Sequence, residues 1–462
     1  MKQVKQQIDI ENDSTSAKRS LIISLAMPAL AETMLVSLVS MVDMMMVATV
    51  GSFAIAAVGL VTQPRFVMLA AFMALNVGAT AMVSRFKGAR DPENANLVLN
   101  QALALGFVLA VCLCIVMFFG GEALVRFLAG KNIAEETIRA ACTYLRIQVY
   151  GFPTLALTFT INASLRGVGN TKASFHNNAV SNLVNVFFNY CLIGGHFGLP
   201  ALGVAGASLA TVIGQCAALG MALSKVLSGR EFIRIDIKKL LRVDFSILKR
   251  IANIGFPALI EQIIMRVGVM LFTTIVTSLG DHSTAAHMIA MNIQMLSFSS
   301  GMAFGVAATT LVGQCLGRVR ADLGKIYVKM TQQVGYFVSG SVALLLFFGG
   351  GLIASFYSKD PELIRLAANM LRIIALVNPV SCARFVYVSA LRGAGDSRYA
   401  AVLSFLGVLI LRPVIAFVLV TPYFPFQVGL AGIWIALSSD GVISWLLSRR
   451  RFLQGKWASI KV

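Results

Sequence analysis

The sequence is poor in charged residues, and acidic residues are the scarcest. Only 13% of the 462 residues are charged, with 20 Asp and Glu against 39 Lys and Arg, whereas a soluble domain carries about 25%. Hydrophobic residues make up 57% of the chain and the mean hydropathy is +0.80. Because roughly 20 apolar residues cross a bilayer, the chain holds enough for about a dozen spans. This composition argues against a soluble enzyme, a disordered regulator or a nucleic-acid-binding domain, and predicts a multi-pass membrane protein.

Several functional motifs are also missing. The sequence contains no GxxxxGK[ST] segment, which argues against an intrinsic ATP motor. The seven cysteines form no CxxC pair and no Cys/His metal spacing, so we expect no metal and no cofactor. No catalytic triad gathers in the loops, and we expect no enzyme activity. The polar first 20 residues lack the short apolar segment of a cleaved signal peptide.

Twelve long apolar runs predict twelve membrane-spanning helices. Each is too long and too evenly apolar for a strand of a membrane barrel. The runs lie at 21–47, 54–84, 97–120, 141–164, 176–194, 202–224, 251–279, 284–315, 331–357, 366–390, 400–421 and 427–448.

Lys and Arg concentrate in alternate loops and at both ends of the chain, from Lys18 and Arg19 to Arg449 and Arg450. By the positive-inside rule, both termini are predicted to be cytoplasmic. The formal net charge of +19 is then mostly a topology signal, and no nucleic-acid partner is expected.

The two halves of the chain repeat one another. The segment Pro28–Glu32 recurs as Pro257–Glu261, and Leu165–Gly169 recurs as Leu391–Gly395. Each half holds six predicted spans, an even number, so the halves share one orientation and an axis along the membrane normal relates them. Such paired bundles predict alternating access. The predicted parts are an N-terminal tail (1–20), an N-lobe (21–224), an amphipathic basic linker (225–250), a C-lobe (251–448) and a basic tail (449–462).

At these motifs the chain resembles the multidrug and toxic compound extrusion (MATE) transporters over nearly its whole length. The similar segments are Ala26-Met27-Pro28 with Val42-Asp43, Leu165–Thr171, Gly203–Thr211 and Leu391–Asp396. The resemblance implies a V-shaped pair of six-helix lobes in the bacterial cytoplasmic membrane. It also implies export of organic, often cationic, compounds in exchange for H⁺ or Na⁺. Nothing in the sequence requires an oligomer, so we expect a monomer.

Asp43 is the main candidate for the coupling acid. It lies inside the first apolar run, about 22 Å past Pro28 along a helix. An ionisable group at such depth is costly and generally functional, and a carboxyl removed from water can exchange a proton near neutral pH. The MATE resemblance implies the same role for it. A buried, hydrogen-bonded structural Asp is the alternative.

Polar residues of the fifth and sixth runs are candidates for the same site. Asn185 and Asn189 are one helical turn apart and share a face, while Asn182 and Thr211 could add further oxygen atoms. In many DinF-type MATE proteins an Asp stands at the position of Asn189. An Asn can ligate Na⁺ or hydrogen-bond to Asp43, but it cannot carry a proton. Interhelical hydrogen bonding without a coupling role is the alternative.

The remaining candidates lie in both halves. In the NorM type, acids sit deeper in the second half, at about Met265 and Ser381 of this chain, so its acids resemble the DinF type more closely. Arg412 and Asp440 are predicted to form a structural ion pair between neighbouring spans. Substrate-cavity candidates are Glu32, Met41, Glu261, Arg266 and Arg384, and predicted kinks lie at Pro28 and Pro257.

Two questions stay open at the level of sequence. If Arg266 and Arg384 face the cavity, an anionic or zwitterionic substrate becomes plausible. A flippase of the related superfamily that carries lipid-linked oligosaccharides, or a natural-product flippase or exporter, with an anionic substrate, is therefore the main alternative function. The sequence does not distinguish H⁺ from Na⁺ coupling, although a lone acid among asparagines favours H⁺.

Overall fold

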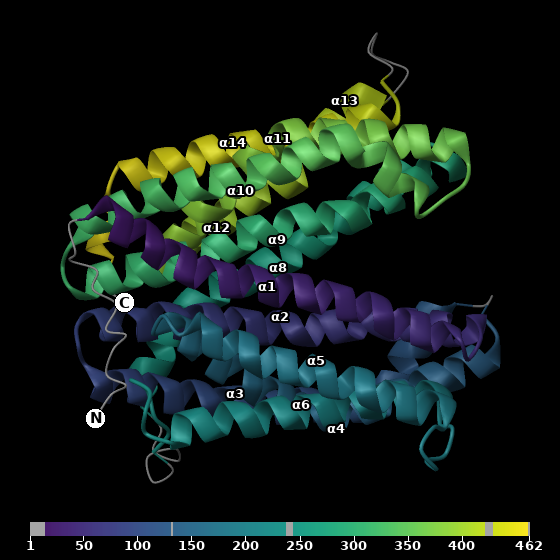
Figure 1. Ribbon diagram of the computed structural model, residues 1–462, viewed down its shortest axis with the longest axis horizontal. Helices are drawn as coiled ribbons and strands as arrows, with labels where there is room; N and C mark the ends of the chain where they lie inside the picture. The colour runs from purple at the N-terminus through teal and green to yellow at the C-terminus, as the bar shows by residue number, and fades with distance from the viewer. Residues whose placement is uncertain (1–13, 131–132, 237–243, 421–427, 461–462) are drawn as a thin grey trace. The chain divides into compact units, whose positions relative to one another are not determined.

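The computed structural model describes residues 14–130, 133–236, 244–420 and 428–460, and all regular structure within these ranges is helical (Figure 1). The first half contains α1 (Thr15–Ala48), α2 (Ser52–Gly88), α3 (Pro92–Ala129), α4 (Glu135–Gly167), α5 (Thr171–Gly194) and α6 (Gly203–Leu227). The second half contains α8 (Phe245–Thr277), α9 (Asp281–Gly317), α10 (Ala321–Ser355), α11 (Pro361–Gly393), α12 (Ser397–Ser404), the π-helix η1 (Phe405–Leu411), α13 (Arg412–Val420), α14 (Leu430–Leu453) and the short 3₁₀-helix η2 (Lys456–Ser459).

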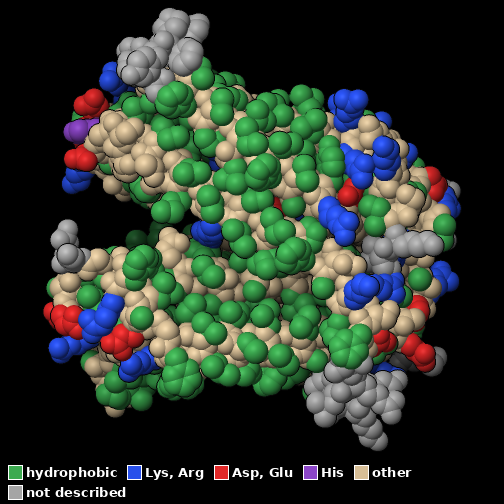
Figure 2. Space-filling model, turned by 180° about the vertical axis from the view of Figure 1, so that it is seen from behind, with side chains coloured by type: hydrophobic (Ala, Val, Ile, Leu, Met, Phe, Trp, Pro, Cys, Tyr) green, Lys and Arg blue, Asp and Glu red, His purple; other side chains and the backbone are tan. Residues whose placement is uncertain are grey.

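The predicted all-helical membrane fold is confirmed. Because α12, η1 and α13 follow one another without a break, each predicted apolar run corresponds to one long helix. Ten of these helices are long and apolar enough to cross a membrane among the described residues. The other two, α4 and α5, are of similar length but carry more polar side chains. Figure 2 shows hydrophobic side chains over the middle of the visible face and charged side chains toward the helix ends.

Capping residues extend several helices beyond their apolar runs. Asp91 accepts a hydrogen bond from the backbone N–H of Asn94 at the start of α3, and Asn170 accepts one from Ala173 at the start of α5, both at 3.0 Å. At α11, Asp360 accepts from the Glu362 N–H at 2.9 Å. A side-chain oxygen at this position satisfies a helix N–H that has no partner within the helix.

The repeated Leu-Arg-Gly-x-Gly motif forms the same turn twice. In one copy the Asn170 N–H donates to the Leu165 carbonyl, and in the other the Asp396 N–H donates to Leu391, both at 2.8 Å. Gly169 and Gly395 have φ values of +93° and +92°, a region that favours glycine. The motif is therefore a helix-ending turn, which positions the arginine before it.

The chain forms two compact units: residues 31–255, and residues 1–30 together with 256–462. The chain thus passes from one unit to the other inside α1 and again inside α8, near Pro28 and Pro257. These units differ from the predicted lobes (21–224 and 251–448), because tertiary packing decides where each helix segment belongs. In the second unit, Ile22, Leu25 and Ala26 of α1 join a buried apolar cluster with Val312 and Tyr387. Both α1 and α8 continue as helices through their prolines.

The predicted tails and the predicted linker also differ in part from what the structure shows. Residues 15–20 already belong to α1, and the first 13 residues lie outside the described ranges. At the other end α14 continues to Leu453, and Phe452 and Trp457 are buried and stacked on one another. Within the predicted linker, residues 237–243 lie outside the described ranges. Residues 230–236 are non-helical, with Ile233 buried and the Lys87 ammonium 4.0 Å from the ring centre of Phe232.

Candidate functional site

The structure brings Asp43 of α1 together with the asparagines of α5. The Asn189 amide donates a hydrogen bond to Asp43 Oδ1 at 2.7 Å. Eleven residues earlier on both helices, the Asn178 amide donates to Glu32 Oε1 at 2.6 Å. Because eleven residues make about three helical turns, the two helices run alongside each other in a fixed register and their polar groups share one face.

Asn185 completes the surroundings of the carboxylate. With its amide nitrogen toward Asp43, it donates to both carboxylate oxygens, at 2.9 and 3.1 Å, and its oxygen accepts from the Thr211 N–H at 3.2 Å. This orientation satisfies both ends of the amide, which is the criterion by which such amides are assigned. The Thr211 hydroxyl donates to the Ala207 carbonyl of its own helix at 2.9 Å. Asp43 is therefore held by two amides from α5, and α6 supports one of them.

Arg65 of α2 is a neighbour of this site that the sequence analysis missed. Its guanidinium interacts electrostatically with both Asp43 and Tyr144. A cation next to Pro64, inside a span, is a signal that could have identified it, because intramembrane charges need partners. The unit 31–255 thus places one acid and one base near each other within an apolar helix bundle.

Two other predicted residues are not joined to Asp43. Asn182 has no hydrogen bond to the carboxylate within the described residues, and its side-chain nitrogen is buried without a partner. Met41 is 49% exposed on the surface of α1. Asn185 and Asn189 therefore contact the acid, and Thr211 supports Asn185. No such hydrogen bond joins Asn182 to the acid in the described ranges.

Glu32 lies in a second polar cluster, with the arginine of the repeated turn. Its carboxylate accepts hydrogen bonds from Arg166 at 3.4 Å and Ser174 at 3.1 Å, besides the one from Asn178. Arg166 also donates to Ser174 at 2.8 Å. The hydrogen-bond partners of this carboxylate within the described residues lie on α4 and α5, in one unit.

Glu261 of α8 has the corresponding arrangement in the other unit. It accepts hydrogen bonds from Arg392 and, at 2.9 Å, from the Ser404 hydroxyl. Arg392 and Ser404 are the repeat counterparts of Arg166 and Asn178, each 226 positions further along the chain. We call these the two Glu–Arg clamps. Their partners are supplied by the protein itself, so neither glutamate is a free acid available to a substrate.

Arg412 and Asp440 meet at a π-helical segment. Arg412 Nη2 donates to Asp440 Oδ2 at 2.7 Å, and the Ser444 hydroxyl donates to Oδ1 at 3.2 Å. Both charged residues are buried, at 9% and 4% exposure. Gly407 of η1 lies directly against Asp440, where a Cβ atom would overlap the carboxylate. The π-helix widens the turn and brings α13 and α14 together at this pair.

Arg384 and Arg266 occupy different surroundings. Arg384 of α11 interacts electrostatically with the acids of both pairs just described, Asp440 and Glu261, without a hydrogen bond to either. Ser381, one turn earlier on α11, is buried and lies near Gly441 of α14. Arg266 lies on α8 and is partly removed from water. Met265 and Ser381 add no acid to this unit.

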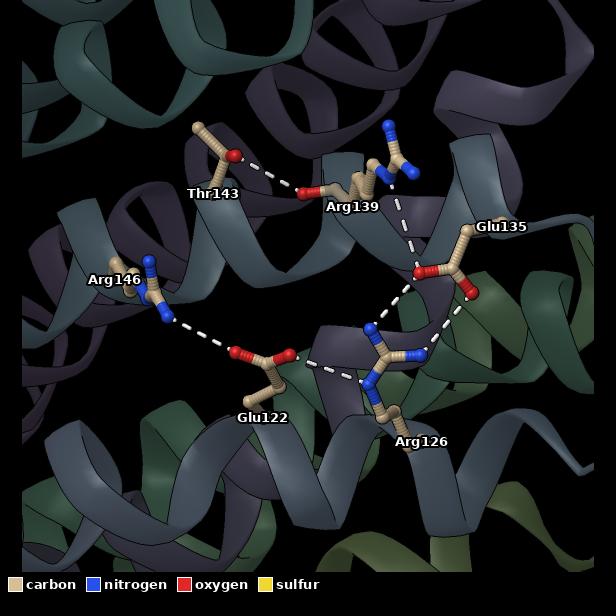
Figure 3. A network of polar contacts seen from close by, with 6 residues as sticks. All are labelled: Glu122, Arg126, Glu135, Arg139, Thr143 and Arg146. Atoms are coloured by element: carbon tan, nitrogen blue, oxygen red, sulfur yellow. Dashed lines mark hydrogen bonds and ion pairs between the residues drawn. The ribbon is translucent and has the colours of Figure 1, made fainter.

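A network of charges links α3 and α4 at their adjoining ends (Figure 3). Arg126 forms two hydrogen bonds to Glu135, at 2.9 and 3.1 Å, and one to Glu122 at 3.2 Å. Arg146 donates to Glu122 at 3.0 Å, and Arg139 lies 3.8 Å from Glu135. These side chains are exposed, and exposed ion pairs contribute about 1 kcal/mol or less each. We assign the network to helix pairing and not to the functional site.

Comparison with known proteins gives consistent matches along the chain. The family model described as MatE matches twice, over residues 28–191 and 257–418. The probable multidrug resistance protein NorM of Thermotoga maritima is 28% identical over 95% of this chain and 93% of its own length.

Solved structures match the fold. One, described as the outward-facing conformation of a multidrug resistance MATE family transporter of the MOP superfamily, superposes with a TM-score of 0.87 at 20% identity, covering 95% of this chain and 96% of its own. Another is a MOP superfamily transporter from Pyrococcus furiosus, with a TM-score of 0.86 at 21% identity over 94% of this chain and 96% of its own. Its description states that a reversed polarity of its binding pocket suggests a different function.

Proposed function

The chain belongs to the MatE family of multidrug efflux transporters, and on that premise we propose that it exports organic compounds in exchange for H⁺ or Na⁺, with Asp43 as the coupling acid. The observation that carries the proposal is the carboxylate of Asp43 held by Asn189 and Asn185 inside a helix that could cross a membrane. Export would proceed by alternating access, from a bacterial inner membrane with both termini in the cytoplasm. A monomer would suffice.

The amide of Asn185 suits both protonation states of Asp43. An ionised carboxylate only accepts hydrogen bonds, whereas a protonated one also donates. With its nitrogen toward Asp43, Asn185 serves the ionised form. With its oxygen there, it would accept from the protonated form, while its nitrogen donates to the Thr211 hydroxyl at 3.3 Å. Proton exchange would then need only an amide rotation.

Sodium coupling would use the same residues differently. Hard cations prefer oxygen ligands, and Asp43, Asn185 and Thr211 can each present one. We favour H⁺, because the carboxylate already accepts hydrogen bonds from two amide donors, and a cation bound there would require these amides to reorient. The absence of an acid at Met265 and Ser381 supports coupling in the manner of the DinF type, through the first span.

A transport assay in liposomes tests this proposal. Purified protein would be reconstituted with a fluorescent cationic dye, and a pH jump applied with and without Na⁺. Dye movement that follows the proton gradient, needs no Na⁺ and disappears in Asp43→Asn is the expected result. The exposed-acid variant Glu122→Gln is the matched control and should transport like wild type.

The alternative outcomes have defined meanings. Movement that follows Na⁺ would reassign Asp43, Asn185 and Thr211 as a metal-ion site. Movement that persists in Asp43→Asn would contradict the role of this residue. Absence of dye movement under either gradient would favour the second candidate, a flippase or exporter of an anionic compound. The surplus of arginine around Arg384 is the observation that supports that candidate.

A further inference from the structure

Three arginines and two acids lie near one another in the unit that contains α11, and the acids are already paired. Glu261 accepts a hydrogen bond from Arg392, and Asp440 accepts one from Arg412. The third arginine, Arg384, interacts with all four of these groups only through longer-range electrostatics. The cluster therefore carries one surplus positive charge, and Arg384 is the residue that supplies it.

Arg384 is buried at its base and accessible toward its tip. Its Nε atom is buried and has no hydrogen-bond partner, while the side chain as a whole keeps part of its surface exposed. No hydrogen bond or ion pair joins Arg384 to another residue in the described ranges. The ring of Phe385, the next residue in the sequence, has its centre 4.7 Å from the guanidinium carbon.

A partly buried guanidinium without a hydrogen-bond partner lowers the stability of a membrane protein. Arg keeps its charge under all physiological conditions, and removing part of its charged group from water without a partner is energetically unfavourable. Both nearby acids are committed to other arginines, so rearranging the cluster would only leave another cation unpaired. The cost is offset when an anion from outside the chain binds the exposed part of the guanidinium.

We propose that Arg384 forms a subsite for the anionic group of the exported compound, a carboxylate or a sulfonate. The planar guanidinium offers paired N–H donors that match the two oxygens of such a group. Ser381, one turn earlier on α11, carries a hydroxyl that could donate to the same group. This inference rests on the proposed export function and favours, among its substrates, compounds that carry an anionic group as well as an apolar body.

A pair of dyes that differ in one group tests the subsite by equilibrium binding. Rhodamine 110 carries a free carboxylate, and rhodamine 123 is its methyl ester. We would measure the Kd of both for the purified full-length protein in detergent, by fluorescence anisotropy without any gradient. Wild type should bind the free acid more tightly than the ester. Arg384→Gln should weaken binding of the acid at least about tenfold, the loss of one charge-assisted hydrogen-bonded pair, and change binding of the ester less than twofold.

Two further variants keep the test decisive. Arg372→Gln removes an exposed charge from the same helix and should change neither Kd. Arg384→Lys keeps the charge without the fork and should give an intermediate loss for the acid alone, which provides a readout if the Gln variant does not fold.

Equal Kd values for the two dyes in wild type would contradict the proposal that Arg384 forms an anion subsite. So would parallel changes for both dyes in Arg384→Gln or Arg384→Lys. Because binding is measured without a gradient, these results leave the test of export through Asp43 independent.

Discussion

At the scale of single residues, the site depends on which amide reaches Asp43. Asn185 and Asn189 do so because they lie one turn apart on the face of α5 that meets α1. Sequence spacing predicted that shared face. It also proposed Asn182, which lies three residues before Asn185 and still does not reach the acid, because spacing along a helix does not determine how far a side chain lies from the neighbouring helix.

We therefore expect Asn189→Ala and Asn182→Ala to differ. The first removes the 2.7 Å hydrogen bond to the carboxylate, and hydrogen bonds to charged groups contribute about 1.5–3 kcal/mol. Export of a cationic dye from liposomes should fall at least about tenfold. Asn182→Ala is the matched control and should stay within about twofold of wild type. Equal losses in both variants would show that the contact with Asp43 is not what matters.

The partners of other residues of the site could not be predicted from sequence. Arg65 stands out in the sequence as a charged residue inside a span, but nothing near it points to Asp43 as the acid with which it interacts electrostatically. The partners of Glu32 were missed for a similar reason, since Arg166 lies 134 residues away. The pair Arg412 and Asp440 was predictable, because two buried opposite charges on neighbouring spans have few other ways to be satisfied.

At the scale of helices, the two Glu–Arg clamps connect the first helix of each half to the repeated turn. Each glutamate follows a proline by four residues, and each arginine precedes a glycine-rich turn. The clamps differ in their remaining donors. Without its arginine, Glu32 keeps Ser174 and Asn178, whereas Glu261 keeps Ser404 alone among the residues that the structure describes. Glu261 is also the more deeply buried of the two.

This difference predicts unequal effects on stability. Breaking a buried pair by removing one partner costs about 3–5 kcal/mol. Arg392→Gln should therefore lower the Tm in detergent clearly, and Arg166→Gln should lower it less. The double variant Glu261→Gln with Arg392→Gln should recover part of the loss, because it leaves no unpaired charge. A larger loss for Arg166→Gln, or no recovery in the double variant, would contradict this account of the clamps.

The π-helix η1 makes a second prediction at this scale. A methyl group at Gly407 would overlap the Asp440 carboxylate, and overpacking a buried site costs about 1–3 kcal/mol. Gly407→Ala should lower the Tm by disturbing the Arg412–Asp440 pair. Gly349→Ala in α10 is the control, since a Cβ there meets no atom within 4 Å. A Tm that falls equally in both variants would indicate a general effect of replacing helix glycines.

At the scale of the whole molecule, the internal repeat is visible in sequence, in the family match and in hydrogen bonds. Thr80 donates to the Ala163 carbonyl at 3.1 Å, and Thr309 donates to Ser389 at 2.9 Å, in equivalent positions. The number of helices and the repeat were therefore predictable. The composition of the compact units was not predictable, because residues 1–30 belong with the second half. This assignment depends on tertiary packing, which no local sequence pattern indicates.

The two ends of α1 belong to different compact units. This predicts how each half of the chain behaves when it is expressed alone. Residues 1–236 expressed alone would expose Ile22, Leu25 and Ala26, whose buried partners lie in the other half. We expect neither 1–236 nor 244–462 to be stable alone, and the two co-expressed to recover dye export, as measured in cells. Stable folding of 1–236 by itself would contradict the assignment of residues 1–30.

The central claim is that Asp43 links the coupling ion to the exported compound. The most direct measurement is the Kd of a cationic dye for the purified protein across a range of pH and Na⁺ concentrations, in wild type and Asp43→Asn. Because coupling between two ligands is reciprocal, wild type should bind the dye more weakly as the coupling ion becomes more abundant. In Asp43→Asn that dependence should vanish. A dependence that persists unchanged in the variant would contradict the role of Asp43.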